Sequence, residues 1–194
     1  MTRYGMLINT KKCVGCSACR IACQMKNHLD PEESFIKYHE IETGEYPNVY
    51  NEIVPTQCMH CEDAPCAAVC PTHATYITDS GVVLVDEEKC IGCGTCAIVC
   101  PYNAPKVDEE KKKAVRCNGC AERVAAGEKP VCVEACPARA LDFGDADEMA
   151  KMGERGNIAP LPDPSETTPN IFIKASADAQ PVGAAEIANP LEVA

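Results

Sequence analysis

The apolar residues of this chain lie in short segments separated by polar and cysteine-rich stretches. YGMLIN at residues 4–9 and GVVLVD at residues 81–86 are apolar runs of strand length, and each leads into a cysteine-rich loop. THATYITD at residues 72–79 and ARALDFGD at residues 138–145 each follow a proline. The pattern predicts four short strands, in which the second pair returns beside the first.

Two short helices are predicted where an apolar segment meets a proline. AIVCP at residues 97–101 and VEACP at residues 133–137 end in this way, because proline lacks an N–H and clashes with the preceding turn. Short strands combined with short helices indicate an α+β fold of two small units, each an antiparallel sheet with two helices. No apolar run approaches about 18 residues, so no direct membrane span is expected.

The C-terminal region, residues 151–194, has a different composition. From Asn157 to Ala194 it contains six prolines in 38 residues and no cysteine. Such a segment cannot bury enough apolar area to fold by itself. It is therefore either a disordered end or an extended arm that lies across a partner subunit. We favour the arm, with Ile171, Phe172 and Ile173 as its anchors.

Composition indicates that something besides side-chain packing stabilises the chain. The 194 residues include three Phe and no Trp, but 16 cysteines. Disulfides or metal centres are the usual substitutes where a chain cannot build enough apolar core. The net charge of −11 would repel phosphate backbones, so nucleic-acid binding is not expected.

The cysteines form four groups of four. Groups one and three follow the spacing C-x2-C-x2-C-x3-C, and groups two and four follow the same plan with residues inserted in the middle. A proline follows the last cysteine of groups two, three and four. The groups are Cys13, Cys16, Cys19 and Cys23; Cys58, Cys61, Cys66 and Cys70; Cys90, Cys93, Cys96 and Cys100; and Cys117, Cys120, Cys132 and Cys136.

This spacing is the ligand run of bacterial ferredoxins. Three thiolates on a tight loop can bind three corners of a 4Fe-4S cube, and Gly15, Gly92 and Gly94 let the backbone curve closely around it. The fourth cysteine begins a helix and binds the other cluster of a pair, as in two-cluster ferredoxins. Four groups therefore predict four 4Fe-4S clusters.

Disulfides and zinc explain the spacing less well. Disulfides between cysteines so close in sequence would close small loops that restrict the unfolded chain little. Zinc sites favour two C-x2-C pairs with a longer gap between them, whereas here a third cysteine follows closely.

Several polar residues near the cysteines are candidates for tuning a cluster. A cation stabilises the added negative charge of a reduced cluster and so raises its potential. Arg20, Lys89, Arg116 and Arg139 lie beside or just past a cysteine, although each also fits an ordinary solvated or partner-facing charge. We expect neutral replacement of Arg116 to lower one potential, and His60 to hydrogen-bond a cluster or the backbone. The sequence offers no catalytic residues.

The four-group pattern, the insertions in groups two and four, and the tail segments APLP, PNIFIK and NPLEV resemble the iron-sulfur subunits of dimethyl sulfoxide reductase and its relatives. The resemblance covers essentially the whole chain. The cysteine pattern alone is shared by electron-transfer subunits of many molybdopterin enzymes. The tail segments indicate the dimethyl sulfoxide reductase type among them. The resemblance implies two interleaved bacterial-ferredoxin-like units, each holding two 4Fe-4S clusters, with an extended C-terminal arm.

The resemblance also implies which thiols share a cluster. By the same resemblance, the first set faces a molybdenum subunit and the fourth lies towards a membrane anchor. The implied sets are set 1 with Cys13, Cys16, Cys19 and Cys136; set 2 with Cys23, Cys117, Cys120 and Cys132; set 3 with Cys70, Cys90, Cys93 and Cys96; and set 4 with Cys58, Cys61, Cys66 and Cys100.

This pairing gives the expected domain organisation. Residues 1–23 together with 111–150 form the first ferredoxin-like unit, and residues 58–110 form the second. Residues 24–57 are an insertion, expected as a surface excursion that touches a partner, and residues 151–194 are the partner-binding tail.

The implied function is that of an electron-transfer subunit with no catalysis of its own. Electrons would pass from a quinol-oxidising membrane anchor to a molybdopterin catalytic subunit that reduces dimethyl sulfoxide or a similar oxide. Two alternatives remain: the same role with another acceptor, such as selenate, a sulfur oxyanion or a phenol to be dehydroxylated, or a free polyferredoxin shuttle.

The cellular location is expected from the resemblance rather than from a signal in the sequence. The N-terminal segment shows no export signal. The resemblance implies a membrane-associated complex on the extracytoplasmic face, reached by co-export with the catalytic subunit, and a cytoplasmic complex is the alternative.

Overall fold

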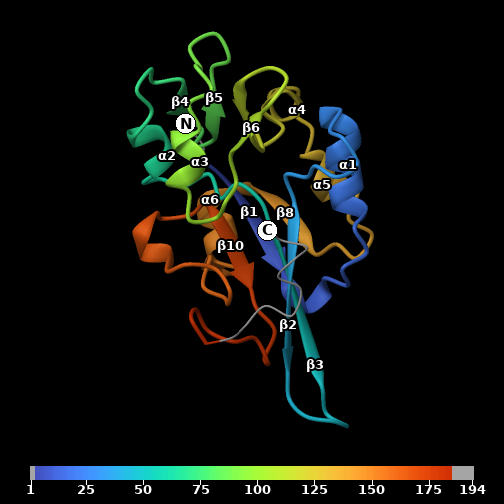
Figure 1. Cartoon of the computed structure of the whole chain (residues 1–194). Helices are drawn as coiled ribbons and strands as arrows, with labels where there is room; N and C mark the ends of the chain where they lie inside the picture. Colours follow the sequence, from blue (N-terminus) through green and yellow to red (C-terminus); the bar gives the residue numbers. More distant parts are fainter. Residues whose placement is uncertain (1–2, 185–194) are drawn as a thin grey trace.

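The computed structural model describes residues 3–184 and centres on a four-stranded mixed sheet (Figure 1). The strand order is β8-β1-β10-β9. β1 pairs antiparallel with β8 and parallel with β10, and β9 pairs antiparallel with β10. The bounds are Tyr4–Asn9 for β1, Leu141–Asp145 for β8, Glu154–Arg155 for β9 and Ile171–Lys174 for β10.

Three antiparallel hairpins complete the strands of the described residues. The β2–β3 hairpin extends away from the body of the molecule, at the opposite end from β4, β5 and β6 (Figure 1). The expected boundary between residues 110 and 111 falls in the turn between β6 and β7. The bounds are Lys37–Thr43 for β2, Tyr50–Thr56 for β3, Thr75–Ile77 for β4, Val83–Val85 for β5, Lys106–Asp108 for β6 and Lys113–Val115 for β7.

The helices are short, and none between residues 3 and 184 is long and apolar enough to cross a membrane. α1 packs against α5, and α2 packs against α3. The bounds are Thr10–Lys12 for the 3-10 helix η1, Ala18–Asn27 for α1, Pro65–Ala68 for α2, Thr95–Ile98 for α3, Ala121–Ala125 for α4, Val131–Glu134 for α5, Ala146–Ala150 for α6 and Pro164–Glu166 for η2.

The predicted elements are present. β1 has the predicted bounds, while β4, β5 and β8 lie inside the other three predicted strands. The predicted pairs form, because β8 returns beside β1 and β4 pairs with β5. The helices predicted at 97–101 and 133–137 correspond to α3 and α5, each of which begins two residues earlier and ends before the cysteine.

The prediction for Ile171, Phe172 and Ile173 is wrong. These residues are not partner anchors but form β10 inside this chain, where each is at most 3% exposed. Ile171 and Ile173 join the main core, and Phe172 packs on the other face of the sheet with Leu7 and a part of α6. The apolar run does indicate a buried segment, but the segment packs beside β1 of this chain rather than on a partner.

The insertion is only in part a surface excursion. It holds the end of α1 and the β2–β3 hairpin. Ile36, Ile41 and Val54 are at most 3% exposed, so the base of the hairpin belongs to the core. Tyr46 near the tip is 92% exposed.

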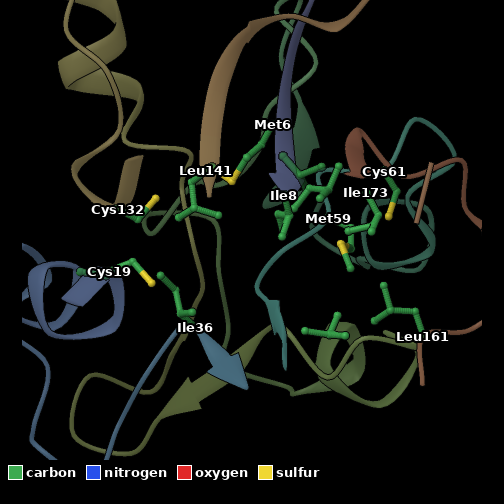
Figure 2. Close-up of a cluster of buried hydrophobic side chains, with 14 of the residues drawn as sticks. Met6, Ile8, Cys19, Ile36, Met59, Cys61, Cys132, Leu141, Leu161 and Ile173 are labelled. Carbon is green, nitrogen blue, oxygen red and sulfur yellow. The ribbon is translucent and has the colours of Figure 1, made fainter. Parts of the chain in front are cut away.

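Cysteines form much of the main core. Figure 2 shows thiols of Cys19, Cys132 and Cys61 among the same buried cluster as Met6 and Ile8 of β1. The central sheet thus supplies part of the aliphatic side chains of a core in which thiols are also major members.

Replacing Phe172 with Ala should destabilise the holoprotein by about 3–5 kcal/mol, because a fully buried aromatic ring is removed from the packing. The loss should appear as a lower apparent melting temperature. Lys174→Ala in the same strand is the matched control, since Lys174 is exposed. Equal melting temperatures for the two variants would contradict the placement of β10 in the core.

Candidate iron-sulfur centres

All sixteen cysteines are free thiols, and fourteen of them are buried or partly buried. The four groups occupy the loops that lead into α1, α2, α3 and α4, together with these helices, α5 and the residues just after the helices. The fourth cysteine of each group lies about one helical turn beyond the third, inside α1 or just after α2, α3 and α5, where it faces another group. The expectation that this cysteine begins a helix is therefore wrong. Three cavities and one compact cluster result.

The first cavity is lined by all four thiols of set 1. The loop before α1 supplies Cys13 and Cys16, α1 supplies Cys19, and Cys136 follows α5. The cavity holds about 340 Å³ of space. The packing of α1 on α5 brings Cys136 to the loop of group one.

The second cavity is lined by the thiols of set 2 and holds about 580 Å³ of space. Cys23 reaches it from the second half of α1, Cys132 from α5, and Cys117 and Cys120 from the loop that leads into α4. Cys58 and His60 of group two also line this cavity.

The third cavity is lined by the thiols of set 3 and holds about 310 Å³ of space. Its loop passes very close to the β6–β7 turn: a Cβ placed on Gly92 would lie 2.2 Å from the carbonyl oxygen of Lys112. Gly92 also has a φ of +67°. Only glycine satisfies both conditions without strain.

The thiols of set 4 are brought together around a cation. Arg116 is 8% exposed, and its guanidinium donates hydrogen bonds to Cys58 Sγ and, at 3.1 Å, to Cys66 Sγ. Burial raises the pKa of Cys61 to about 12, and the nearby thiols Cys58, Cys100 and Cys66 add to this rise. Cys61 therefore interacts electrostatically with the other three members of the set.

The arrangement of the thiols fits 4Fe-4S clusters. Between residues 3 and 184, no three His, Cys, Asp or Glu side chains converge as ligands of a single metal ion. Backbone N–H groups already point at ligand sulfur atoms, from Ala114 to Cys90 and from Ala140 to Cys136, both at 3.3 Å. Such donors stabilise negative charge on the sulfur atoms.

Several buried thiols resist conversion to thiolates. Burial and, second, the neighbouring thiol of Cys120 together raise the pKa of Cys23 to about 11. Burial likewise raises the pKa of Cys132 well above its ordinary value. Four buried thiolates without iron would repel each other, whereas iron binds the deprotonated form.

The sets differ in their access to solvent. Cys16 of set 1 and Cys93 of set 3 are the two exposed thiols. Set 4 has Cys58, Cys61 and Cys66 buried. The expectation that set 4 lies towards a membrane anchor stays a prediction.

The tail contributes to set 4. Thr167 is 2% exposed, interacts with Cys61, and shares a hydrogen bond of 2.8 Å with the hydroxyl of Tyr102. Nothing in the spacing of the cysteines points to either residue.

Tyr38 of β2 was also missed by sequence reasoning. Its hydroxyl lies 3.0 Å from Cys19 Sγ of set 1. It belongs to the insertion, and no local motif connects the two residues. When Cys19 is a ligand, it has no proton, so the Tyr38 hydroxyl is the donor.

Of the four candidate cations, Arg116 meets the sequence expectation best. Among the described residues it is the one cation whose side chain is seen to donate to a ligand sulfur. Lys89 forms an ion pair with Asp86 at 2.8 Å, and Arg139 is exposed. Burial raises the pKa of Cys96, and Arg116 partly offsets that rise, so this cation lies between sets 3 and 4.

Tyr38→Phe should lower the midpoint potential of the set 1 cluster, because one hydrogen bond to sulfur that favours the reduced state is lost. A neutral hydrogen bond of about 0.5–1.5 kcal/mol corresponds to about 20–60 mV for one electron. A redox titration followed by EPR measures the shift. Tyr46→Phe at the exposed hairpin tip is the control, and equal potentials in both variants would contradict the donor role.

Arg116→Gln should lower the potential of the set 4 cluster by about 60 mV, the one-electron equivalent of about 1.4 kcal/mol. The physical reason is the loss of a buried positive charge beside a centre that gains an electron. Arg139→Gln, next to set 1 but exposed, should leave all four potentials unchanged. An unchanged titration of Arg116→Gln would refute the tuning role.

Sequence comparisons agree with these sites. Profiles of the 4Fe-4S dicluster domain match residues 12–74 and residues 49–146. Two dicluster domains and sixteen cysteines are consistent with four 4Fe-4S clusters.

Curated relatives cover the whole chain. The chain is 43% identical over 203 aligned positions to the B subunit of anaerobic dimethyl sulfoxide reductase from Escherichia coli, and the alignment covers 99% of both proteins. It is 38% identical to the subunit of the same name from Haemophilus influenzae, over 100% of both. The thiosulfate reductase electron transfer subunit PhsB of Salmonella typhi is 40% identical over 75% of this chain and 78% of its own length. The chain therefore belongs to the family of iron-sulfur electron-transfer subunits of anaerobic dimethyl sulfoxide reductases, which are not themselves catalytic.

Proposed function

We propose that this chain conducts electrons through four 4Fe-4S clusters, from a quinol-oxidising membrane anchor to a molybdopterin catalytic subunit that reduces dimethyl sulfoxide or a similar oxide. The observation that carries the proposal is the grouping of the thiols into four sets, of which sets 1 and 3 each have an exposed thiol and sets 2 and 4 have none. Such an arrangement suits a conductor between two partners.

The proposed ligands are the four sets as defined above. Cavities lined by sets 1, 2 and 3, and the interactions within set 4, support this assignment. The packing of α1 on α5 and of α2 on α3 supports the division into a unit of groups one and four and a unit of groups two and three.

Contacts between neighbouring sets support the order 1, 2, 4, 3. Sets 1 and 2 are joined by α1, which carries Cys19 and Cys23 one turn apart. Sets 2 and 4 meet where Cys58 lines the set 2 cavity. Sets 4 and 3 meet at Arg116, which interacts with Cys58 and Cys96.

Each cluster, when bound, takes up and releases one electron. The residues of this chain set how readily it does so. Buried thiolates hold the iron away from water, backbone N–H groups and Tyr38 donate to sulfur, and Arg116 offsets the added negative charge. No residue is needed to break a substrate bond.

The ends of the series of clusters differ in their proposed partners. Set 1 is proposed to face the catalytic subunit, and set 3 is proposed to receive electrons from the anchor. Val14, next to set 1, is 67% exposed, and Ile91, within the loop of set 3, is 64% exposed. Exposed apolar residues beside an exposed ligand suit a partner that excludes water from the electron path.

A second candidate is the same role with another acceptor. Relatives named as thiosulfate reductase and tetrathionate reductase subunits favour it, because the acceptor is determined outside this chain. A free shuttle is the other alternative, and a long docking arm would argue against it, because a freely diffusing carrier has no use for such an arm. That argument fails for residues 171–174, which lie in the central sheet, so the partner must be tested directly.

We propose that the complex lies on the extracytoplasmic face of the membrane, by co-export with its catalytic partner. A cytoplasmic complex is the alternative. Protease treatment of intact spheroplasts distinguishes the two.

Photo-crosslinking tests the function and its direction together. A benzophenone amino acid at position 14 should capture a molybdenum-containing subunit, and one at position 91 should capture a membrane subunit. A probe at Lys151, which is exposed just after α6 on the sheet face opposite the main core, is the control. The proposal would be contradicted if the protein purified anaerobically as a monomer and neither position gave a crosslinked partner. That result would favour the free shuttle.

A further inference from the structure

His60 lies between two ligand sets: its backbone is part of the set 4 loop, and its side chain lines the set 2 cavity. In the chain it stands inside the ligand loop of set 4, between Cys58 and Cys61. Its side chain nevertheless lines the cavity of set 2 together with Cys117 and Gly119. It is thus placed where the clusters of sets 2 and 4 approach each other in the proposed order.

The backbone at His60 is held in an uncommon conformation. Its φ is +44°, in the left-handed region that non-glycine residues rarely occupy. The side-chain amide of Asn170, which is 2% exposed, donates to the His60 carbonyl oxygen at 3.0 Å. The segment just before β10 therefore fixes this loop from outside.

The imidazole ring is also fixed by a hydrogen bond, and this bond determines which ring nitrogen is the donor. The backbone N–H of Val83, in β5, donates to His60 Nδ1 at 3.0 Å. If Nδ1 carried a proton, its N–H would face the N–H of Val83, and neither could accept a hydrogen bond from the other. Nδ1 therefore accepts the Val83 N–H, and the donor of the ring is Nε2.

That Nε2–H has no protein acceptor among the described residues, although it is fully buried. Buried donors without a partner are rare in native proteins. Nε2 is near Gly119, where an added Cβ would lie 3.7 Å from it, and His60 interacts with the thiol of Cys117. The unsatisfied donor thus faces the place that the set 2 cluster would occupy.

We propose that His60 is a positioning residue between the clusters of sets 2 and 4, donating a hydrogen bond from Nε2 to a sulfur atom of the set 2 cluster. The acceptor is either the Cys117 thiolate or a bridging sulfide. This bond stabilises the reduced state of that cluster and holds an ordered ring at the crossing between the two ferredoxin-like units. The inference rests on the proposed function, which supplies the clusters.

Three variants of the full chain, with clusters assembled anaerobically, test the inference. His60→Phe keeps a planar ring but removes the donor. His60→Gln keeps an N–H donor at similar reach. His73→Phe is the matched control, because His73 is an exposed histidine with a φ of +52° that follows a ligand of set 3.

EPR-monitored redox titration gives the decisive readout. In His60→Phe, one midpoint potential, that of the set 2 cluster, should shift downward while the other three stay in place. His60→Gln should restore it at least in part, and His73→Phe should match the native chain. An unshifted set 2 potential in His60→Phe, equal shifts of all four potentials, or loss of the cluster from both His60 variants would overturn the inference.

Labelling with 15N-histidine gives an independent readout. A nitrogen coupling to the reduced set 2 cluster should be present in the native chain and in His73→Phe, and absent from His60→Phe. A native chain with four clusters but no such coupling would overturn this inference alone. A native chain that assembles far fewer than four clusters would instead refute the proposed function.

Discussion

The structure depends on bringing sixteen thiols together in four sets of four, most of them at least partly buried in an apolar interior. Burial favours the neutral thiol, as the raised pKa values of Cys23 and Cys61 show. Iron binds the thiolate, so cluster assembly reverses that preference and converts four mutually repelling groups into ligands of one cation-rich centre. The clusters accordingly replace the large side chains that this chain lacks, and folding is coupled to their assembly.

This constraint explains why elements far apart in sequence meet at the ligand sets. The insertion places Tyr38 beside set 1, the β7 end places Arg116 beside set 4, and the tail places Thr167 and Asn170 against group two. Each supplies a donor to sulfur or fixes a loop that does. The segments outside the cysteine groups thus set the electrostatic surroundings of the clusters rather than merely connecting them.

Much of this architecture was predictable from the sequence, because local rules determine it. Strand β1 follows from an apolar run, and the cysteine spacing indicates the kind of cluster. Register between distant strands follows no such rule, and for this reason Ile171, Phe172 and Ile173 were assigned to a partner rather than to β1. Exposure of the ligands was equally unpredictable, since the placement of set 4 inside the molecule depends on Arg116, Tyr102 and the tail packing around it. Tyr38 was missed for the same reason.

The central claim is that the clusters form the interior of this protein. It is tested most directly by measuring iron, sulfide and near-ultraviolet circular dichroism on anaerobically prepared protein before and after iron chelation. The account predicts about sixteen irons per chain, four for each predicted cluster, and loss of the tertiary signal when the iron is removed. A chain that keeps its tertiary signal and its thermal transition without iron would contradict it.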